Sequence, residues 1–108
     1  MDTLSKNWQF ARAYRSKKRF ASPLVATYVV PHRGDGIRIG ITASKKLGCA
    51  VERNRARRIV KAAASSLLSD ADGCFDIVFV CRGAIAGKKS TDLEPVLRSH
   101  LKSAGVLK

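Results

Sequence analysis

The sequence is poor in acidic residues and in long apolar runs. Asp and Glu number 8 against 21 Lys and Arg in 108 residues, which gives a formal net charge of +13. No apolar run approaches the roughly 20 residues that a membrane-spanning helix needs. The N-terminal residues also lack the apolar segment of a signal peptide. We therefore expect a cytoplasmic protein with no membrane partner.

Groups that could hold a metal or activate water are scarce and scattered. The three cysteines lack CxxC spacing, so neither a zinc site nor a disulfide framework is expected. They are Cys49, Cys74 and Cys81. His32 and His100 lie far apart in the chain, and Asp70–Asp72 falls in a predicted helix-ending turn. The remaining acids form no nuclease-like cluster. We expect no catalytic residue and no metal ligand on the polypeptide itself.

The length and composition favour a single domain over residues 1–108. Hydrophobic residues make up 45% of the chain, which suffices for one compact core. Clustered Lys and Arg favour a polyanionic partner, because they release counterions condensed on phosphates. A charge that serves only solubility is the alternative, and it does not explain the clustering.

The pattern predicts helices over about 5–15, 50–68 and 91–102, the last opened by a capping box of Thr91 and Glu94. Strands are expected over 20–30, 37–45 and 74–81. The first two are predicted to be antiparallel neighbours joined by a turn. The third is apolar on both faces and is therefore expected at the centre. This order, αββαβα, predicts an α+β fold, a two-layer α/β sandwich.

The strand over 37–45 alternates cleanly between two kinds of side chain. Its apolar face is predicted to be buried, and its other face is small and polar. The apolar residues are Ile37, Ile39, Ile41 and Ala43.

The helix over 50–68 combines an apolar stripe with unrelieved positive charge. At about 100° per residue, Ala56, Ile59, Val60, Ala63 and Leu67 share one arc, which is the predicted buried stripe. The opposite side and its flanks carry Arg53, Asn54, Arg55, Arg57, Arg58 and Lys61.

These cations recur three and four residues apart, and each such pair costs about 0.2–0.5 kcal/mol. A solvated structural face would interleave both signs, whereas only Glu52 lies nearby. An anionic partner relieves the repulsion, and arginine suits phosphate because its guanidinium binds two oxygens at once. Ser44, Lys45 and Lys46 extend the same surface upstream.

A second group of residues is aromatic. Phe10 and Tyr14 share one face of the first helix, and Tyr28 lies on the first strand. Aromatic rings of this kind stack on unpaired bases while cations such as Lys17 follow the backbone. The same rings could instead pack the helix on the sheet, and the residues alone leave both interpretations open. Trp8 falls off this face, and we predict a packing role for it.

The stretch "SKKLGCAVERNRARR" resembles the bacterial ribonuclease P protein family, whose pattern is S-K-K-x-G-x-A-V-x-R-N-R-x-K/R-R. Ser44, Lys45, Lys46, Gly48, Ala50, Val51, Arg53, Asn54, Arg55, Arg57 and Arg58 match it in order. The resemblance extends over nearly the whole chain and includes a strand that ends in Arg82. Cys49 departs from it, because the family often has a polar residue there.

This resemblance implies a protein subunit of ribonuclease P, which assists endonucleolytic removal of the 5′ leader from precursor tRNA. It implies a left-handed β-α-β crossover, against the usual rule. The partners would be the catalytic ribonuclease P RNA and the single-stranded leader, with no obligate protein partner. The catalytic centre, with Mg²⁺, would be held mainly by the RNA and substrate.

The resemblance also implies two sets of binding residues. The catalytic RNA would be bound by Ser44, Lys45, Lys46, Arg53, Asn54, Arg55, Arg57, Arg58 and Lys61. The leader would be bound by Phe10, Tyr14, Lys17, Tyr28 and Arg82.

Other functions fit the sequence less well. A ribosomal or other basic RNA-binding module without a processing role would need the basic helix but no aromatic groove. A DNA-binding helix-turn-helix domain is disfavoured, because the basic helix lies between strands. An independent enzyme would need the carboxylate or histidine cluster that the sequence lacks.

Overall fold

The computed structural model describes residues 2–4, 6–31, 36–69, 71 and 73–107. Its elements in chain order are β1 (Asp2–Thr3), α1 (Asn7–Tyr14), β2 (Lys18–Ala21), β3 (Val25–Pro31), β4 (Ile37–Ala43), the 3₁₀ turn η1 (Lys45–Leu47), α2 (Ala50–Leu68), β5 (Phe75–Cys81), the 3₁₀ turn η2 (Gly83–Ile85) and α3 (Ser90–Ser103). The basic helix α2 has the predicted bounds, and the α+β fold is confirmed.

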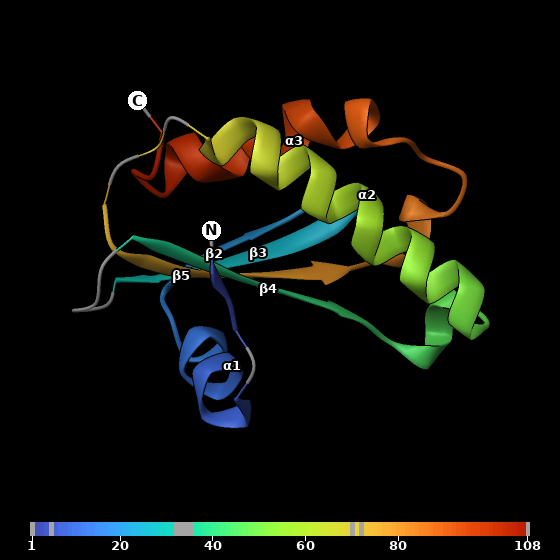
Figure 1. Cartoon of the computed structure of the whole chain (residues 1–108), viewed down its shortest axis with the longest axis horizontal. Helices are drawn as coiled ribbons and strands as arrows, with labels where there is room; N and C mark the ends of the chain where they lie inside the picture. The colour runs from blue at the N-terminus through green and yellow to red at the C-terminus, as the bar shows by residue number, and fades with distance from the viewer. Residues whose placement is uncertain (1, 5, 32–35, 70, 72, 108) are drawn as a thin grey trace.

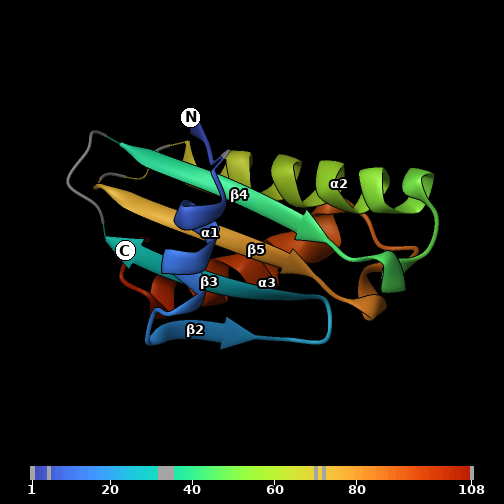
Figure 2. The same cartoon turned by 90° about the horizontal axis from the view of Figure 1, so that it is seen from below.

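The strands form a five-stranded sheet in the order β1-β4-β5-β3-β2. The central position predicted for β5 is confirmed, with β3 antiparallel on one side and β4 parallel on the other. In Figure 2, β4 and β5 both run from left to right, α2 lies behind the sheet, and β5 lies below β4. The β4-α2-β5 connection is therefore left-handed, against the usual rule and as the family resemblance implied.

Two of the strand predictions are wrong. Residues 20–30 do not form one strand, because the chain turns between β2 and β3. The Ser22 hydroxyl accepts a hydrogen bond from the Val25 N–H at 3.1 Å and donates one to the Val25 carbonyl at 3.0 Å. The strands β3 and β4 are not neighbours either, because β5 lies between them. The strand β5 is apolar on both faces, so it is most stable at the centre of the sheet, where other elements cover both its faces and both its edges.

The helices cover the two faces of the sheet unequally. Figure 1 shows α2 and α3 on one face and α1 alone on the other. The main core lies under α2 and α3, and a smaller cluster around Leu4, Ala13 and Val78 lies under α1. The alternation predicted for β4 is confirmed, since Ile37, Ile39 and Ala43 belong to the main core and Ile41 packs against it. The other face of β4 is left for α1.

The buried stripe of α2 is displaced slightly from the predicted one. Its fully buried members are Ala56, Val60, Ala63, Ala64 and Leu68. The predicted members Ile59 and Leu67 are only partly buried at the edge of the stripe. The stripe is made mainly of alanine, which lets the helix backbone approach the sheet closely.

The capping box predicted for α3 is wrong. The helix begins at Ser90, one residue early, and the Asp92 carboxylate accepts a hydrogen bond from the backbone N–H of Lys89 at 2.9 Å. Asp92 therefore occupies the third helical position that the prediction gave to Glu94.

A buried carboxylate joins α1 to the sheet. Asp76 on β5 has no exposed surface, yet it carries an ionisable group. Its carboxylate accepts a hydrogen bond from Arg12 of α1 at 2.6 Å and two from Arg38 of β4, at 2.8 and 3.0 Å. The charge-assisted bonds compensate the burial of the Asp76 carboxylate. Both guanidinium groups remain partly exposed, so they keep part of their hydration.

We expect Asp76→Asn to lower the free energy of unfolding by about 3 kcal/mol or more, because two guanidinium groups lose their anion. Arg12→Ala and Arg38→Ala should each cost less, since the remaining arginine still compensates Asp76. Urea unfolding of the three variants measures this order. A loss for Asp76→Asn within the roughly 0.5 kcal/mol typical of surface substitutions would contradict it.

Candidate nucleic-acid interface

The packing of α2 turns its positive charge outward. Because the alanine-rich stripe faces the sheet and α3, the other side of the helix faces solvent. Asn54, Arg58 and Lys61 are exposed, while Arg53, Arg55 and Arg57 are half-buried along the flanks. We call the exposed and half-buried polar residues of α2 from Arg53 to Lys61 the basic surface.

The cations of the basic surface are oriented by neutral groups. Arg57 donates a hydrogen bond to the Asn54 side-chain oxygen at 2.8 Å, and Arg55 donates one to the Lys88 carbonyl at 2.6 Å. The Nε atom of Arg53 is buried without a hydrogen-bond partner. Within the described part of the chain, no cation of this surface forms an ion pair. Its positive charge is therefore available to an external anion.

On the opposite face of the sheet, α1 places aromatic side chains over β4 and β3. Phe10 lies directly on Gly40, where an added Cβ would be 2.6 Å from the ring. Tyr14 is 44% exposed and meets Tyr28 edge to face, with 5.1 Å between the ring centroids. We call these three residues and the strand surface beside them the aromatic groove.

The aromatic groove combines packing with exposure. The Phe10 ring is half-buried against Gly40, so its packing role is real. The ring of Tyr28 is also half-buried, and the Arg19 guanidinium lies 5.8 Å from its centroid. Lys17 is exposed just beyond the end of α1. The groove therefore offers ring surface and positive charge together.

The basic surface and the aromatic groove meet at the edge of β4. A cavity of about 230 Å³ opens there, and it is lined on one side by Phe10 and on the other by cations of α2. Its lining residues are Thr3, Leu4, Phe10, Ile39, Ile41, Arg57, Arg58 and Lys61. Residues predicted for two different ligands thus share one cavity.

The remaining predicted residues lie where β4 and β5 end. A second cavity, of about 210 Å³, is lined there by Ser44, Lys46 and Arg82. Arg82 was predicted to act with the aromatic residues, but it lines this cavity with Ser44 and Lys46 instead. The backbone of Lys45 lies in η1, and its side chain is outside what the structure describes.

Sequence reasoning missed two features of this interface. Trp8 was predicted to pack, and that is wrong: it is 56% exposed, with the Arg12 guanidinium 5.9 Å from its ring. The pairing of Asp76 with Arg12 and Arg38 was not foreseen either. A single acid in the apolar run "FDIVFVC" was the available signal, because a buried charge requires a partner.

Besides Asp76, which is paired as a carboxylate, burial favours the neutral forms of two titratable groups inside the fold, Cys81 and His100. Burial raises the pKa of the Cys81 thiol to about 11, so it stays protonated. Burial also lowers the pKa of His100, whose Nδ1 lies 2.9 Å from the Thr27 hydroxyl. Among the described residues, no three His, Cys, Asp or Glu side chains gather as metal ligands would. His32, Asp70 and Asp72 lie outside the described residues.

None of the helices in the described ranges is both long and apolar enough to cross a bilayer.

Comparison with known proteins identifies the family. The Ribonuclease P family model matches residues 1–105. A ribonuclease P protein component from Clostridium botulinum (strain Loch Maree / Type A3) is 34% identical over 104 residues, which cover 95% of this chain and 94% of that protein. A ribonuclease P protein component from Clostridium kluyveri is 32% identical over 107 residues, which cover 97% and 96%.

The fold is also that of a solved relative. The structure of the Staphylococcus aureus RNase P protein superposes with a TM-score of 0.85 at 28% identity, covering 100% of this chain and 99% of that one. The family model, the two relatives and this fold agree along the same length of chain. The chain belongs to the ribonuclease P protein family.

Proposed function

We propose that this chain is the protein subunit of a ribonuclease P holoenzyme and that it binds two RNAs at once. The catalytic ribonuclease P RNA occupies the basic surface, and the single-stranded 5′ leader of precursor tRNA occupies the aromatic groove. The observation that carries the proposal is the cavity at the edge of β4. Phe10 lies on one of its sides and Arg57, Arg58 and Lys61 lie on the other.

The basic surface suits the backbone of a folded RNA. Its arginines pair with no acid among the described residues, and their planar guanidinium groups fit phosphate oxygens. Asn54 lies among them as a neutral group, oriented by Arg57. Lys46 and Ser44 continue the surface toward the ends of β4 and β5, with the side chain of Arg82 beside them.

The aromatic groove suits an unpaired strand of any sequence. Every base has a face that stacks on Tyr14, Tyr28 or Phe10, and stacking of this kind carries little sequence preference. Lys17 and Arg19 lie near enough to the groove to attract the leader phosphates. A general RNA-binding module would have the basic surface without such a groove.

The chemistry belongs to the RNA in this proposal. Mg²⁺ held mainly by the catalytic RNA and the substrate activates the water that cleaves the leader. The polypeptide raises the affinity for precursor tRNA and neutralises backbone charge. It acts in the cytoplasm and needs no other protein partner.

Replacing Arg53, Arg57 and Arg58 together by Ala should weaken binding to ribonuclease P RNA and flatten its salt dependence. Each lost phosphate contact reduces the slope of log affinity against log salt by about 0.7–0.9. The helix should remain folded, because Ala is the better helix former and repulsion is removed.

The matched control replaces Lys89, Arg98 and Lys102, three exposed cations at the start and along the outside of α3. This control removes the same number of positive charges, but it should leave the slope of log affinity against log salt nearly unchanged. Equal slopes for the two variants would mean that the arginines of α2 are only a solvated face.

Replacing Phe10 and Tyr28 by Leu should weaken binding of precursor tRNA to the assembled holoenzyme. Leucine keeps apolar volume over Gly40 but removes the rings. Each base that no longer stacks should cost up to about 1–3 kcal/mol of binding free energy. Mature tRNA has no leader, so its affinity should hardly change.

A thermal melt of the double variant comes first, because both residues also pack. If the variant stays folded and loses affinity for precursor and mature tRNA alike, the leader does not occupy this groove.

A further inference from the structure

The start of α2 holds an acidic residue that the basic surface does not explain. Glu52 is the one acid in the first turn of this helix. It forms no hydrogen bond or ion pair with any described residue. Arg55, three residues along, is its natural helical partner. Its guanidinium instead donates a hydrogen bond to the Lys88 carbonyl, across the gap between α2 and the loop after η2.

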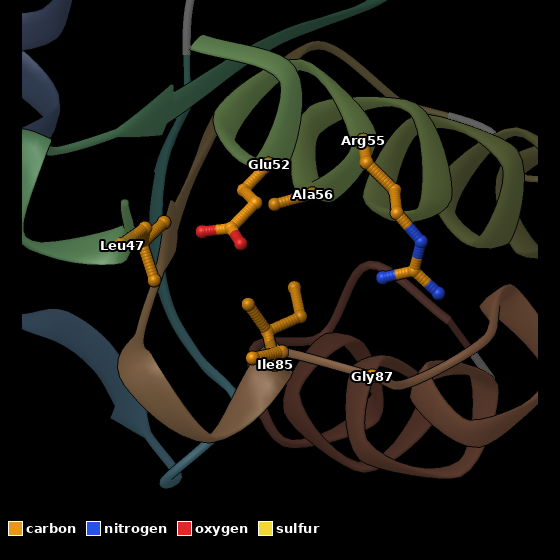
Figure 3. A pocket seen from close by; sticks show the side chains of 7 residues that line it. Leu47, Glu52, Arg55, Ala56, Ile85 and Gly87 are labelled. Atoms are coloured by element: carbon orange, nitrogen blue, oxygen red, sulfur yellow. The ribbon is translucent and has the colours of Figure 1, made fainter. Parts of the chain in front are cut away.

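A cavity of about 380 Å³ lies between these two side chains. Figure 3 shows the Glu52 carboxylate beside Leu47 and Ile85, and the Arg55 guanidinium on the other side, toward Gly87. Ala56 lies between them on α2. The cavity shares no lining residue with the one lined by Phe10, and it adjoins the one lined by Arg82 at Leu47. A volume near the lower end of the usual range of about 300–1,000 Å³ suits a ligand of one or two rings.

The Glu52 side chain is exposed, and its carboxylate lies against the backbone of Gly48. Gly48 has φ +120°, and an added Cβ there would collide with the Glu52 carboxylate. The carboxylate therefore lies against bare backbone at the cavity wall. Ile85 is buried, and Leu47 is half-buried, so the cavity also has an apolar surface. A flat ring can pack on that surface while its edge reaches the carboxylate.

An ionised carboxylate accepts hydrogen bonds and donates none. On a protein that binds a polyanion, it repels phosphate, so a part of the RNA that binds it has to offer hydrogen-bond donors. Guanine is the standard base whose pairing edge offers two adjacent donors, N1–H and the 2-amino group. Adenine and cytosine place an acceptor beside their amino group, and uracil places its single N–H between two carbonyls.

The geometry points to a nucleobase site: the cavity between Glu52 and Arg55 takes one unpaired guanine of the bound RNA. Glu52 accepts from N1–H and the 2-amino group. Arg55 donates to the acceptors O6 and N7, a pairing that arginine makes with guanine in other complexes. Leu47 and Ile85 pack on the ring. The inference rests on the proposed function and adds a base-specific contact to an interface that otherwise binds phosphate.

Glu52→Gln tests the site because the two accounts predict opposite signs. Removing a negative charge from a surface that binds RNA should leave binding unchanged or tighten it, if only electrostatics acts. If Glu52 accepts from guanine, the variant should bind ribonuclease P RNA about 5- to 100-fold more weakly, since its amide presents donors to donors. Glu94→Gln, on α3, gives the same change in net charge and is the matched control.

The site holds if Glu52→Gln weakens RNA binding while Glu94→Gln does not and both variants melt like the parent protein. Equal affinities for the two variants overturn it and leave the proposed function intact. If the parent protein itself fails to bind ribonuclease P RNA, the proposed function fails, and the guanine site is then decided with free nucleotides.

That second measurement is an NMR titration of the full chain with GMP, IMP and AMP, which carry the same phosphate. GMP should shift the backbone amides of Leu47, Glu52, Ile85 and Gly87. IMP lacks the 2-amino group, so it should bind at least about 5-fold more weakly than GMP. AMP should bind no better than IMP. Equal shifts with all three nucleotides, or shifts confined to other residues, overturn the guanine site.

Discussion

The ion pairs of Asp76 are the contact on which the arrangement of the basic surface and the aromatic groove depends. The carboxylate is fully buried in the central strand, and it receives Arg12 from α1 and Arg38 from β4. The apolar cluster under α1 is smaller than the main core, so this ion pair is a major attachment of α1 to the sheet. Fixing α1 in this way sets where Phe10 and Tyr14 lie over the strands. The position of the aromatic groove therefore depends on the buried Asp76 of β5, which pairs with Arg12 of α1.

The strand order determines how the basic surface and the groove meet. Because β5 is central, β4 lies one place from the edge, beside the two-residue β1. The short β1 leaves the later part of β4 free, and the cavity shared by Phe10 and the cations of α2 opens there. The left-handed connection brings α2 over this side of the sheet. The cations of α2 and the Phe10 ring therefore lie beside one another at the edge of β4.

Much of the fold could be predicted from local patterns, and the failures have physical causes. The apolar period of α2 and the two-faced apolar run of β5 were sufficient to predict the helix bounds and the central strand. The pairing of β3 with β5 was not predictable from turn chemistry, because it depends on which strand needs burial on both faces. The break between β2 and β3 depends on the side-chain hydrogen bonds of Ser22, which strand propensity does not register.

The residues of the candidate site could be predicted from the sequence better than which of them lie together. The basic helix and the aromatic residues were identified from sequence, but Arg82 lies with Lys46 rather than with the rings. The pairing of Asp76 was not foreseen, because its partners Arg12 and Arg38 are distant from it in the chain. The prediction for Trp8 was wrong, because the side chain stays exposed beside Arg12 of the same helix. Glu52 stood out in sequence only as an exception to the positive charge, and its cavity appears once η2 folds against α2.

The central claim is that this polypeptide assists an RNA catalyst and has no catalytic centre of its own. The most direct measurement is cleavage of precursor tRNA at low Mg²⁺ by ribonuclease P RNA alone, by RNA-free protein alone, and by the two together. The account predicts efficient release of the 5′ leader only from the mixture, and an intact precursor with the protein alone. Cleavage by the RNA-free protein, or no gain when the protein is added to the RNA, would contradict it.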